Sequence, residues 1–229
     1  LLMSKLPNAR LVVHARGARH LVDPGQLWAG VCQVYGEEVA RRDYGELVAV
    51  PADRVTATED GQVLFLGHRP LRFLDTPGHA KHHHCIWDEA SGGCFTGDTL
   101  GISYEALRPP GVHYALPSTT PVQFDPEALR VSIGRLLALK PKRALLTHYG
   151  AVDDVERQAE LVLAQAGAMV DLARRTPEAG LREALRELYW REASALGLPM
   201  DRATFTDLTT MDVELNAQGL AVYLASSQR

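Results

Sequence analysis

Residues 71–98 read LRFLDTPGHAKHHHCIWDEASGGCFTGD, and this stretch decides the fold. Two apolar runs within it end in turn residues, and each turn carries a side chain that can bind a metal: His79 after Pro77-Gly78, and Asp98 after Gly97. A third apolar run, residues 143–147, is followed in the same way by His148. Pro-Gly and Gly-Asp stop a strand and let the backbone turn sharply. We therefore expect His79, Asp98 and His148 to project from strand ends and to form a metal site.

Each motif taken alone has an ordinary explanation. A single Pro-Gly-His is usually a histidine in a turn, because short patterns match by chance. Asp and Gly favour turns for purely local reasons, so Asp98 alone would be assigned to a turn. The order and placement of the three motifs together indicate a metal site.

The composition restricts the partners. The chain has 229 residues, a net charge of -4 and 46% apolar residues, so it lacks the basic character that attracts nucleic acid. No run approaches the roughly 18 apolar residues of a membrane helix, and no secretion signal is visible. The three cysteines, an odd number without paired spacing, fit free thiols. We expect a cytoplasmic protein that acts on a small-molecule substrate and has no nucleic-acid or membrane partner. If the protein associates with itself, we expect a homodimer.

Apolar periodicity predicts a mixed α/β (α+β) domain over residues 1–150 and a helical C-terminal extension over residues 151–229. A buried strand is expected at residues 10–15 and a helix at 25–42. Next we expect a meander of about five strands, a proline-rich ordered loop over 101–126, a helix starting at Asp125-Pro126, and a strand at 143–147. The expected meander strands are 54–58, 62–66, 71–75, 82–87 and 93–96. Three helices complete the chain, the last over about 212–225.

Other polar residues near the motifs have weaker assignments. His82, His83 and His84 cannot converge on one ion, because successive strand residues face opposite ways. Tyr104 lies close enough to Asp98 in sequence to place its hydroxyl over a substrate carbonyl, and the proline-rich loop offers His113 and Tyr114 for similar work. Packing is the alternative for all three residues. We predict that Cys85 and Cys94 lie on neighbouring strands as core thiols.

In their order and spacing, the three motifs resemble the later ligand motifs of the metallo-β-lactamase superfamily, and most closely those of its glyoxalase II-like hydrolases. The resemblance implies an αββα sandwich with a two-metal centre between its sheets. His79 would complete the first metal site, Asp98 would bridge, and His148 would complete the second. His83, four residues after His79, would support the site without binding metal. The family's earlier His-x-His-x-Asp-His cluster is not in this sequence, so we expect that an N-terminal part of the fold is truncated here.

Carboxylate and imidazole ligands suit two divalent cations, with zinc expected and iron or manganese as alternatives. The resemblance implies a metal-dependent hydrolase in which a metal-bound hydroxide attacks an ester, thioester or lactone carbonyl, with Asp98 and Tyr104 as catalytic residues. A mononuclear iron dioxygenase acting on persulfides is an alternative on the same fold. A non-catalytic binding protein is the alternative if the first ligand cluster is absent from the natural protein.

Overall fold

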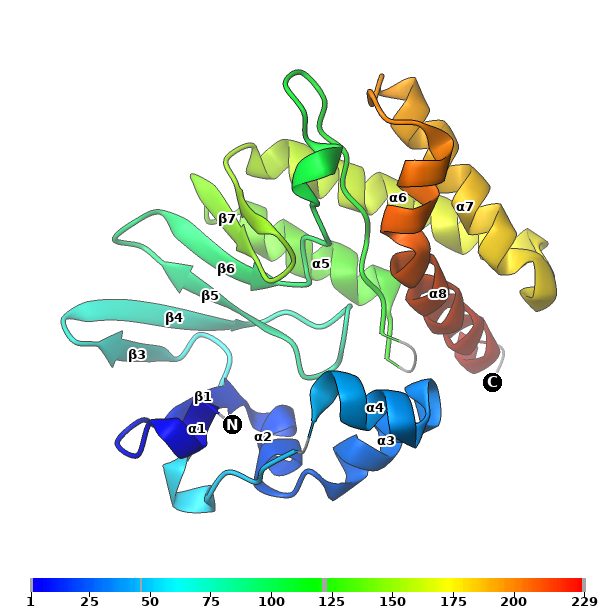
Figure 1. Cartoon of the computed structure of the whole chain (residues 1–229). Coiled ribbons are helices and arrows are strands. Elements are labelled where there is room, and N and C mark those ends of the chain that lie inside the picture. Colours follow the sequence, from blue (N-terminus) through cyan, green and yellow to red (C-terminus); the bar gives the residue numbers. More distant parts are fainter. Residues whose placement is uncertain (1, 46, 121–122, 228–229) are drawn as a thin grey trace. The chain divides into compact units, whose positions relative to one another are not determined.

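The computed structural model describes residues 2–45, 47–120 and 123–227 (Figure 1). Backbone contacts divide the chain into two compact units, Leu1–Gln62 and Val63–Arg229, which we describe separately. The second unit contains both the larger sheet and the C-terminal helices. The division expected at residue 150 stays a prediction.

The first unit is mostly helical, with one pair of short strands. Its elements are α1 (Leu2–Lys5), β1 (Leu11–His14), α2 (Ala15–Val22), α3 (Gly25–Tyr35), α4 (Glu37–Tyr44), a 3-10 turn (Ala52–Arg54) and β2 (Val55–Thr58). The strand expected at 10–15 is confirmed as β1. The single helix expected over 25–42 is wrong, because Gly36 has a φ of 82° and separates α3 from α4. Placing β2 in the meander is also wrong, because β2 pairs in parallel with β1.

The second unit is built on a six-stranded sheet with the strand order β3-β4-β5-β6-β7-β8. Its strands are β3 (Val63–Leu66), β4 (Arg69–Asp75), β5 (His84–Asp88), β6 (Gly93–Gly97), β7 (Arg143–Leu146) and β8 (Gly150–Val152). The strands β3 to β6 form the antiparallel meander, and β7 lies parallel to β6. Consequently β4, β6 and β7 run in the same direction, and their carboxyl ends meet at one edge of the sheet.

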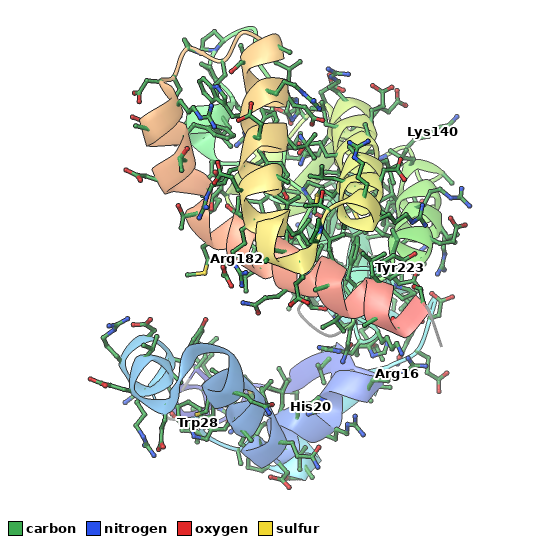
Figure 2. The ribbon with its side chains drawn as sticks, turned by 90° about the vertical axis from the view of Figure 1, so that its right-hand side faces the viewer. Arg16, His20, Trp28, Lys140, Arg182 and Tyr223 are labelled. Carbon is green, nitrogen blue, oxygen red and sulfur yellow. The ribbon has the colours of Figure 1, made fainter. Side chains whose placement is uncertain are left out.

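Helices α5 (Pro126–Leu137) and α6 (Val155–Arg175) lie behind this sheet in Figure 1. The helices α7 (Glu178–Ala195) and α8 (Arg202–Ser227) pack against α6 and against each other, and a 3-10 turn lies at Glu105–Leu107. The start of α5 is confirmed: Asp125 caps it by accepting hydrogen bonds from the backbone N–H groups of Glu127 and Ala128. The predicted stripes of α6 and α7 are buried. Figure 2 shows Arg182 of α7 beside α8, where it pairs with Glu214.

The α8 helix begins ten residues before its expected start near 212. Its buried face mixes polar residues with apolar ones, so the apolar period is weak. The buried polar members are Thr209, Asp212 and Asn216. Among the residues that the structure describes, no helix combines the length and apolarity that crossing a bilayer requires.

Two buried glutamines of α6 hold the segment that follows β6. The Gln158 amide donates to the carbonyl of Leu100 at 2.7 Å, and the Gln165 amide donates to the carbonyl of Ala115 at 2.6 Å. A buried amide is tolerated only when its hydrogen bonds are made. The proline-rich segment is therefore an ordered loop, as predicted, over its described residues.

Candidate metal site

His79 follows β4 at the point where the chain passes closely over α5. Gly78 has a φ of 140°, and a Cβ there would lie 2.4 Å from the Cα of Leu129, so only glycine fits. The Nδ1 of His79 lies 2.9 Å from the carbonyl oxygen of Ser118. A carbonyl can only accept, so Nδ1 carries a proton, and in the neutral ring Nε2 then keeps its lone pair. That Nε2 lies 3.6 Å from Oδ2 of Asp98.

Asp98 follows β6, and His83 holds its backbone. The N–H of Asp98 donates to Nε2 of His83 at 3.0 Å. The Nδ1 of His83 must therefore carry the proton, and it lies 2.9 Å from the hydroxyl of Thr76 and 3.1 Å from that of Thr99. Gly97 makes room for this ring, since a Cβ there would lie 2.2 Å from Nε2 of His83. His83 thus contacts the backbone of Asp98, and its supporting role stays a prediction.

His148 follows β7, and its Nε2 lies 3.3 Å from Oδ1 of Asp98. The next residue, Tyr149, has a φ of 84°, which is rare for a residue with a Cβ. Three contacts hold this turn. The N–H of Ser103 donates to the carbonyl of His148, Arg108 donates to the carbonyl of Tyr149, and the ring of Tyr104 stacks on that of Tyr149 with centroids 4.6 Å apart.

The structure thus brings His79, Asp98 and His148 together, with each imidazole facing a different carboxylate oxygen. Oδ1 of Asp98 is buried and accepts no hydrogen bond within the described part of the chain. Such an atom costs about 1–3 kcal/mol if nothing compensates it. Each oxygen of Asp98 therefore faces one imidazole, and a carboxylate placed in this way would be able to bind one cation on each side. Among the described residues, no group of three or more His, Cys, Asp and Glu side chains is arranged to hold a metal ion.

The electrostatics suit a neutral ligand at His79. Burial lowers the pKa of His79, while the carboxylate of Asp98 acts in the opposite direction. Metals bind the neutral imidazole. The side chain is therefore held in the protonation state and tautomer that leave Nε2 available.

Asp212 of α8 is a residue of this site that the sequence reasoning missed. The hydroxyl of Tyr104 donates to Oδ2 of Asp212 at 2.9 Å. Burial raises the pKa of Asp212 to about 6, against the effects of the Tyr104 hydrogen bond and the nearby His148. Burial and the Asp212 carboxylate raise the pKa of Tyr104. The only signal in the sequence was an acidic residue on the inner face of a helix, in line with Thr209 and Asn216.

The loop residues His113 and Tyr114 lie elsewhere. His113 Nε2 lies 2.6 Å from the side-chain oxygen of Gln158, and the buried Tyr114 hydroxyl donates to the carbonyl of Tyr189. Packing, the alternative considered for them, describes their surroundings. Cys85 and Cys94 are buried on β5 and β6, which confirms the predicted placement.

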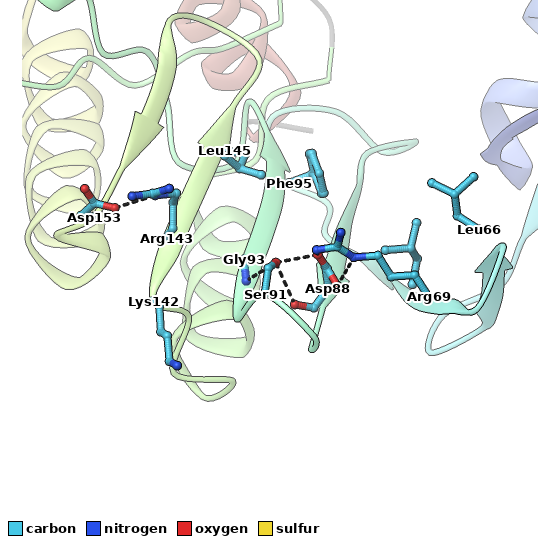
Figure 3. Close-up of a pocket in the computed structure, with 11 residues that line it drawn as sticks. Leu66, Arg69, Asp88, Ser91, Gly93, Phe95, Lys142, Arg143, Leu145 and Asp153 are labelled. Atoms are coloured by element: carbon cyan, nitrogen blue, oxygen red, sulfur yellow. Dashed lines mark hydrogen bonds and ion pairs between the residues drawn. The ribbon is translucent and has the colours of Figure 1, made fainter.

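A separate hollow of about 530 Å³ lies on the sheet face that the helices leave uncovered (Figure 3). It is lined by residues at the starts of β6 and β7, including Gly93 and Arg143, whereas Asp98 and His148 follow the ends of these strands. Arg69 pairs with Asp88 on its rim, and Arg143 pairs with Asp153. The hollow is therefore distinct from the candidate metal site.

Comparison with known proteins identifies the family and the fold of the chain. Residues 4–148 match the family model described as Metallo-beta-lactamase superfamily. The metallo-beta-lactamase fold-containing protein ST1585 of Sulfurisphaera tokodaii is 32% identical over 100 residues, which are 44% of this chain and 34% of that protein. The matched segment thus spans about a third of this curated relative.

Solved structures show the same fold. The crystal structure of ST1585, an archaeal metallo-beta-lactamase superfamily protein from Sulfolobus tokodaii, aligns with a TM-score of 0.59 at 24% identity, over 85% of this chain and 73% of that one. The metallo-beta-lactamase family protein TTHA1429 from Thermus thermophilus aligns with a TM-score of 0.58 at 21% identity, over 98% of this chain and 69% of that one. These similarities establish the α/β fold with its helical C-terminal extension.

Proposed function

Because this chain belongs to the metallo-β-lactamase superfamily, whose members generally bind divalent metals, we propose that it works as a metal-dependent hydrolase. The proposed substrates are small molecules with an ester, thioester or lactone carbonyl, handled in the cytoplasm. The glyoxalase II-like subtype is part of the same proposal. The observation that carries it is the placement of two imidazole Nε2 atoms against the two oxygens of one partly buried carboxylate.

His79, Asp98 and His148 would hold two divalent cations. Zinc is the expected metal, and iron and manganese are the alternatives. The uncompensated Oδ1 of Asp98 supports this fit, because a cation would satisfy it. When bound, two such ions supply a water of lowered pKa and positive charge opposite a developing oxyanion. The ligands of this chain would serve both ions, and Asp98 would be shared between them.

The chain's other residues keep these side chains in place. His83 fixes the backbone of Asp98 through its Nε2, and Ser118 fixes the tautomer of His79. Groups that orient a metal ligand matter for affinity nearly as much as the ligand itself.

Tyr104 and Asp212 are polar residues near His148. In the structure, the Tyr104 proton is committed to Asp212. A protonated Asp212 adds a second proton to the Tyr104–Asp212 pair. One of the two groups could then donate a hydrogen bond to a substrate oxygen. The catalytic role of Tyr104 therefore depends on Asp212.

The test is hydrolysis of ester, thioester and lactone substrates by the protein made from its native gene, before and after metal removal. We expect activity that chelation abolishes and zinc restores, and that falls by orders of magnitude in Asp98→Asn. The matched control is Asp207→Asn, which changes an exposed acid of α8.

Two results would replace the proposal. One iron per chain with oxygen uptake on a persulfide would establish a dioxygenase instead. Full hydrolytic activity in His79→Ala and Asp98→Asn would exclude catalysis at this site, whereas no hydrolysis by the unchanged, metal-loaded protein would favour a binding protein.

A further inference from the structure

Asn216 is a buried amide in the middle of α8, with 1% of its surface exposed. Asparagine is a poor helix former, and burying its amide costs free energy unless every hydrogen bond is made. A side chain of this kind on a packed helix face therefore has partners outside its own helix.

The side-chain amide of Asn216 bonds to three groups on other segments. Its Oδ1 accepts from the N–H of Thr119 at 2.9 Å. Its Nδ2 donates to the carbonyl of Pro117 at 2.9 Å and to the hydroxyl of Tyr189 at 2.9 Å. The amide thus holds the backbone on both sides of Ser118, where the loop runs beside α8 (Figure 1).

Close packing against α8 also restrains the segment around Ser118. The hydroxyl of Thr119 donates to the carbonyl of Leu215 at 3.2 Å. A Cβ at Gly219 would lie 2.3 Å from Oγ1 of Thr119, so α8 approaches the loop as closely as a glycine allows. The peptide groups around Ser118 therefore have little freedom to rotate.

The carbonyl held in this way is the one that His79 Nδ1 contacts at 2.9 Å. We propose that Asn216 is a positioning residue for His79: it orients the Ser118 carbonyl, which sets the tautomer and ring direction of the imidazole. The helical extension thereby sets the geometry of a ligand 137 positions earlier in the chain. The consequence for metal binding rests on the proposed function, whereas the tautomer does not.

The first test is long-range proton-nitrogen NMR of the His79 ring in the 229-residue chain at about pH 8, where histidine is neutral. A His79→Gln variant identifies the signals. In the unchanged chain we expect the tautomer protonated at Nδ1. Asn216→Leu, which keeps the volume but removes both polar atoms, should give a mixture of the two tautomers.

Thr209→Val is the matched control, because Thr209 is a buried polar residue of α8 whose hydroxyl donates within its own helix, to the carbonyl of Phe205. It should leave the tautomer unchanged. If Asn216→Leu does not fold, Gly219→Ala takes its place, since it displaces Thr119 while keeping the amide. An unchanged Nδ1 tautomer in the folded variant would overturn the proposal.

The second test is zinc affinity in the protein made from its native gene. Losing a group that orients a metal ligand costs about 10–100-fold in affinity, so Asn216→Leu should show that loss and Thr209→Val should not. A tautomer change without zinc binding in the unchanged protein would refute the metal site but keep Asn216 as a positioning residue. Zinc binding that Asn216→Leu leaves intact, with an unchanged tautomer, would refute the role of Asn216 alone.

Discussion

Replacing Gly97 by alanine should destabilise the second unit through two effects that can be separated. Gly97 has a φ of 51°, and the left-handed conformation costs a residue with a Cβ about 1–2 kcal/mol. The added Cβ would also lie 2.2 Å from Nε2 of His83, so the ring must move and release the N–H of Asp98. Leaving that donor without a partner costs about 1–3 kcal/mol more. The total loss should therefore be about 2–5 kcal/mol.

Gly197→Ala isolates the first effect. Gly197 also has a positive φ, 76°, but nothing lies within 4 Å of a Cβ built there. Urea unfolding followed by tryptophan fluorescence measures both variants, in a Trp28→Phe background so that Trp87 and Trp190 report on the second unit alone. We expect Gly97→Ala to lose about 1–3 kcal/mol more than Gly197→Ala. Equal losses would refute the reasoning that His83 is held against Gly97 to orient Asp98.

Three further predictions concern stability. The hydrogen bond from Arg69, together with that from Ser91, lowers the pKa of Asp88 to about 2, below its usual value of about 3.9. The contribution of the ionised Asp88 to the free energy of unfolding is therefore complete above about pH 4 and is lost as the pH falls toward 2. Asp88→Asn should then destabilise the protein at neutral pH but not at about pH 2. A loss of stability that is independent of pH in urea unfolding would contradict this. Removing the cap of α5 with Asp125→Ala should cost about 1 kcal/mol in the same assay, and Asp125→Ser should recover most of it; no loss would mean that the cap is not needed. Lys140 is exposed with a φ of 51°, so Lys140→Gly should stabilise the protein by roughly 0.5–1 kcal/mol, and a lower melting temperature would refute the strain argument.

The strand ends that carry the candidate ligands could be predicted because their signals are local. An apolar run of strand length followed by Pro-Gly or Gly-Asp defines both the strand and the turn, and it needs no knowledge of partners. The structure places His79, Asp98 and His148 together because β4, β6 and β7 run in one direction. Their role as metal ligands stays a prediction.

Pairing could not be read from the same patterns. The sequence around β2 shows a strand but not its partner, and β2 pairs with β1 instead of joining the meander. Similarly, apolar periodicity continued across Gly36, where the backbone conformation breaks the helix.

Asp212 and Asn216 were missed because their partners are far away in the chain. The Tyr104–Asp212 hydrogen bond joins residues 108 positions apart, and the Thr119–Asn216 hydrogen bond joins residues 97 apart. A polar side chain on the inner face of a helix was the only local signal. Such a signal shows that a partner is needed without showing which one.

The most direct test of the central claim is the divalent metal content of the protein made from its native gene, measured by elemental analysis and compared with that of Asp98→Asn. If Asp98 bridges two cations held with His79 and His148, the unchanged protein should carry two per chain, and the variant should lose both. Two tightly bound cations that persist in Asp98→Asn would contradict the account, because the shared carboxylate would then hold neither.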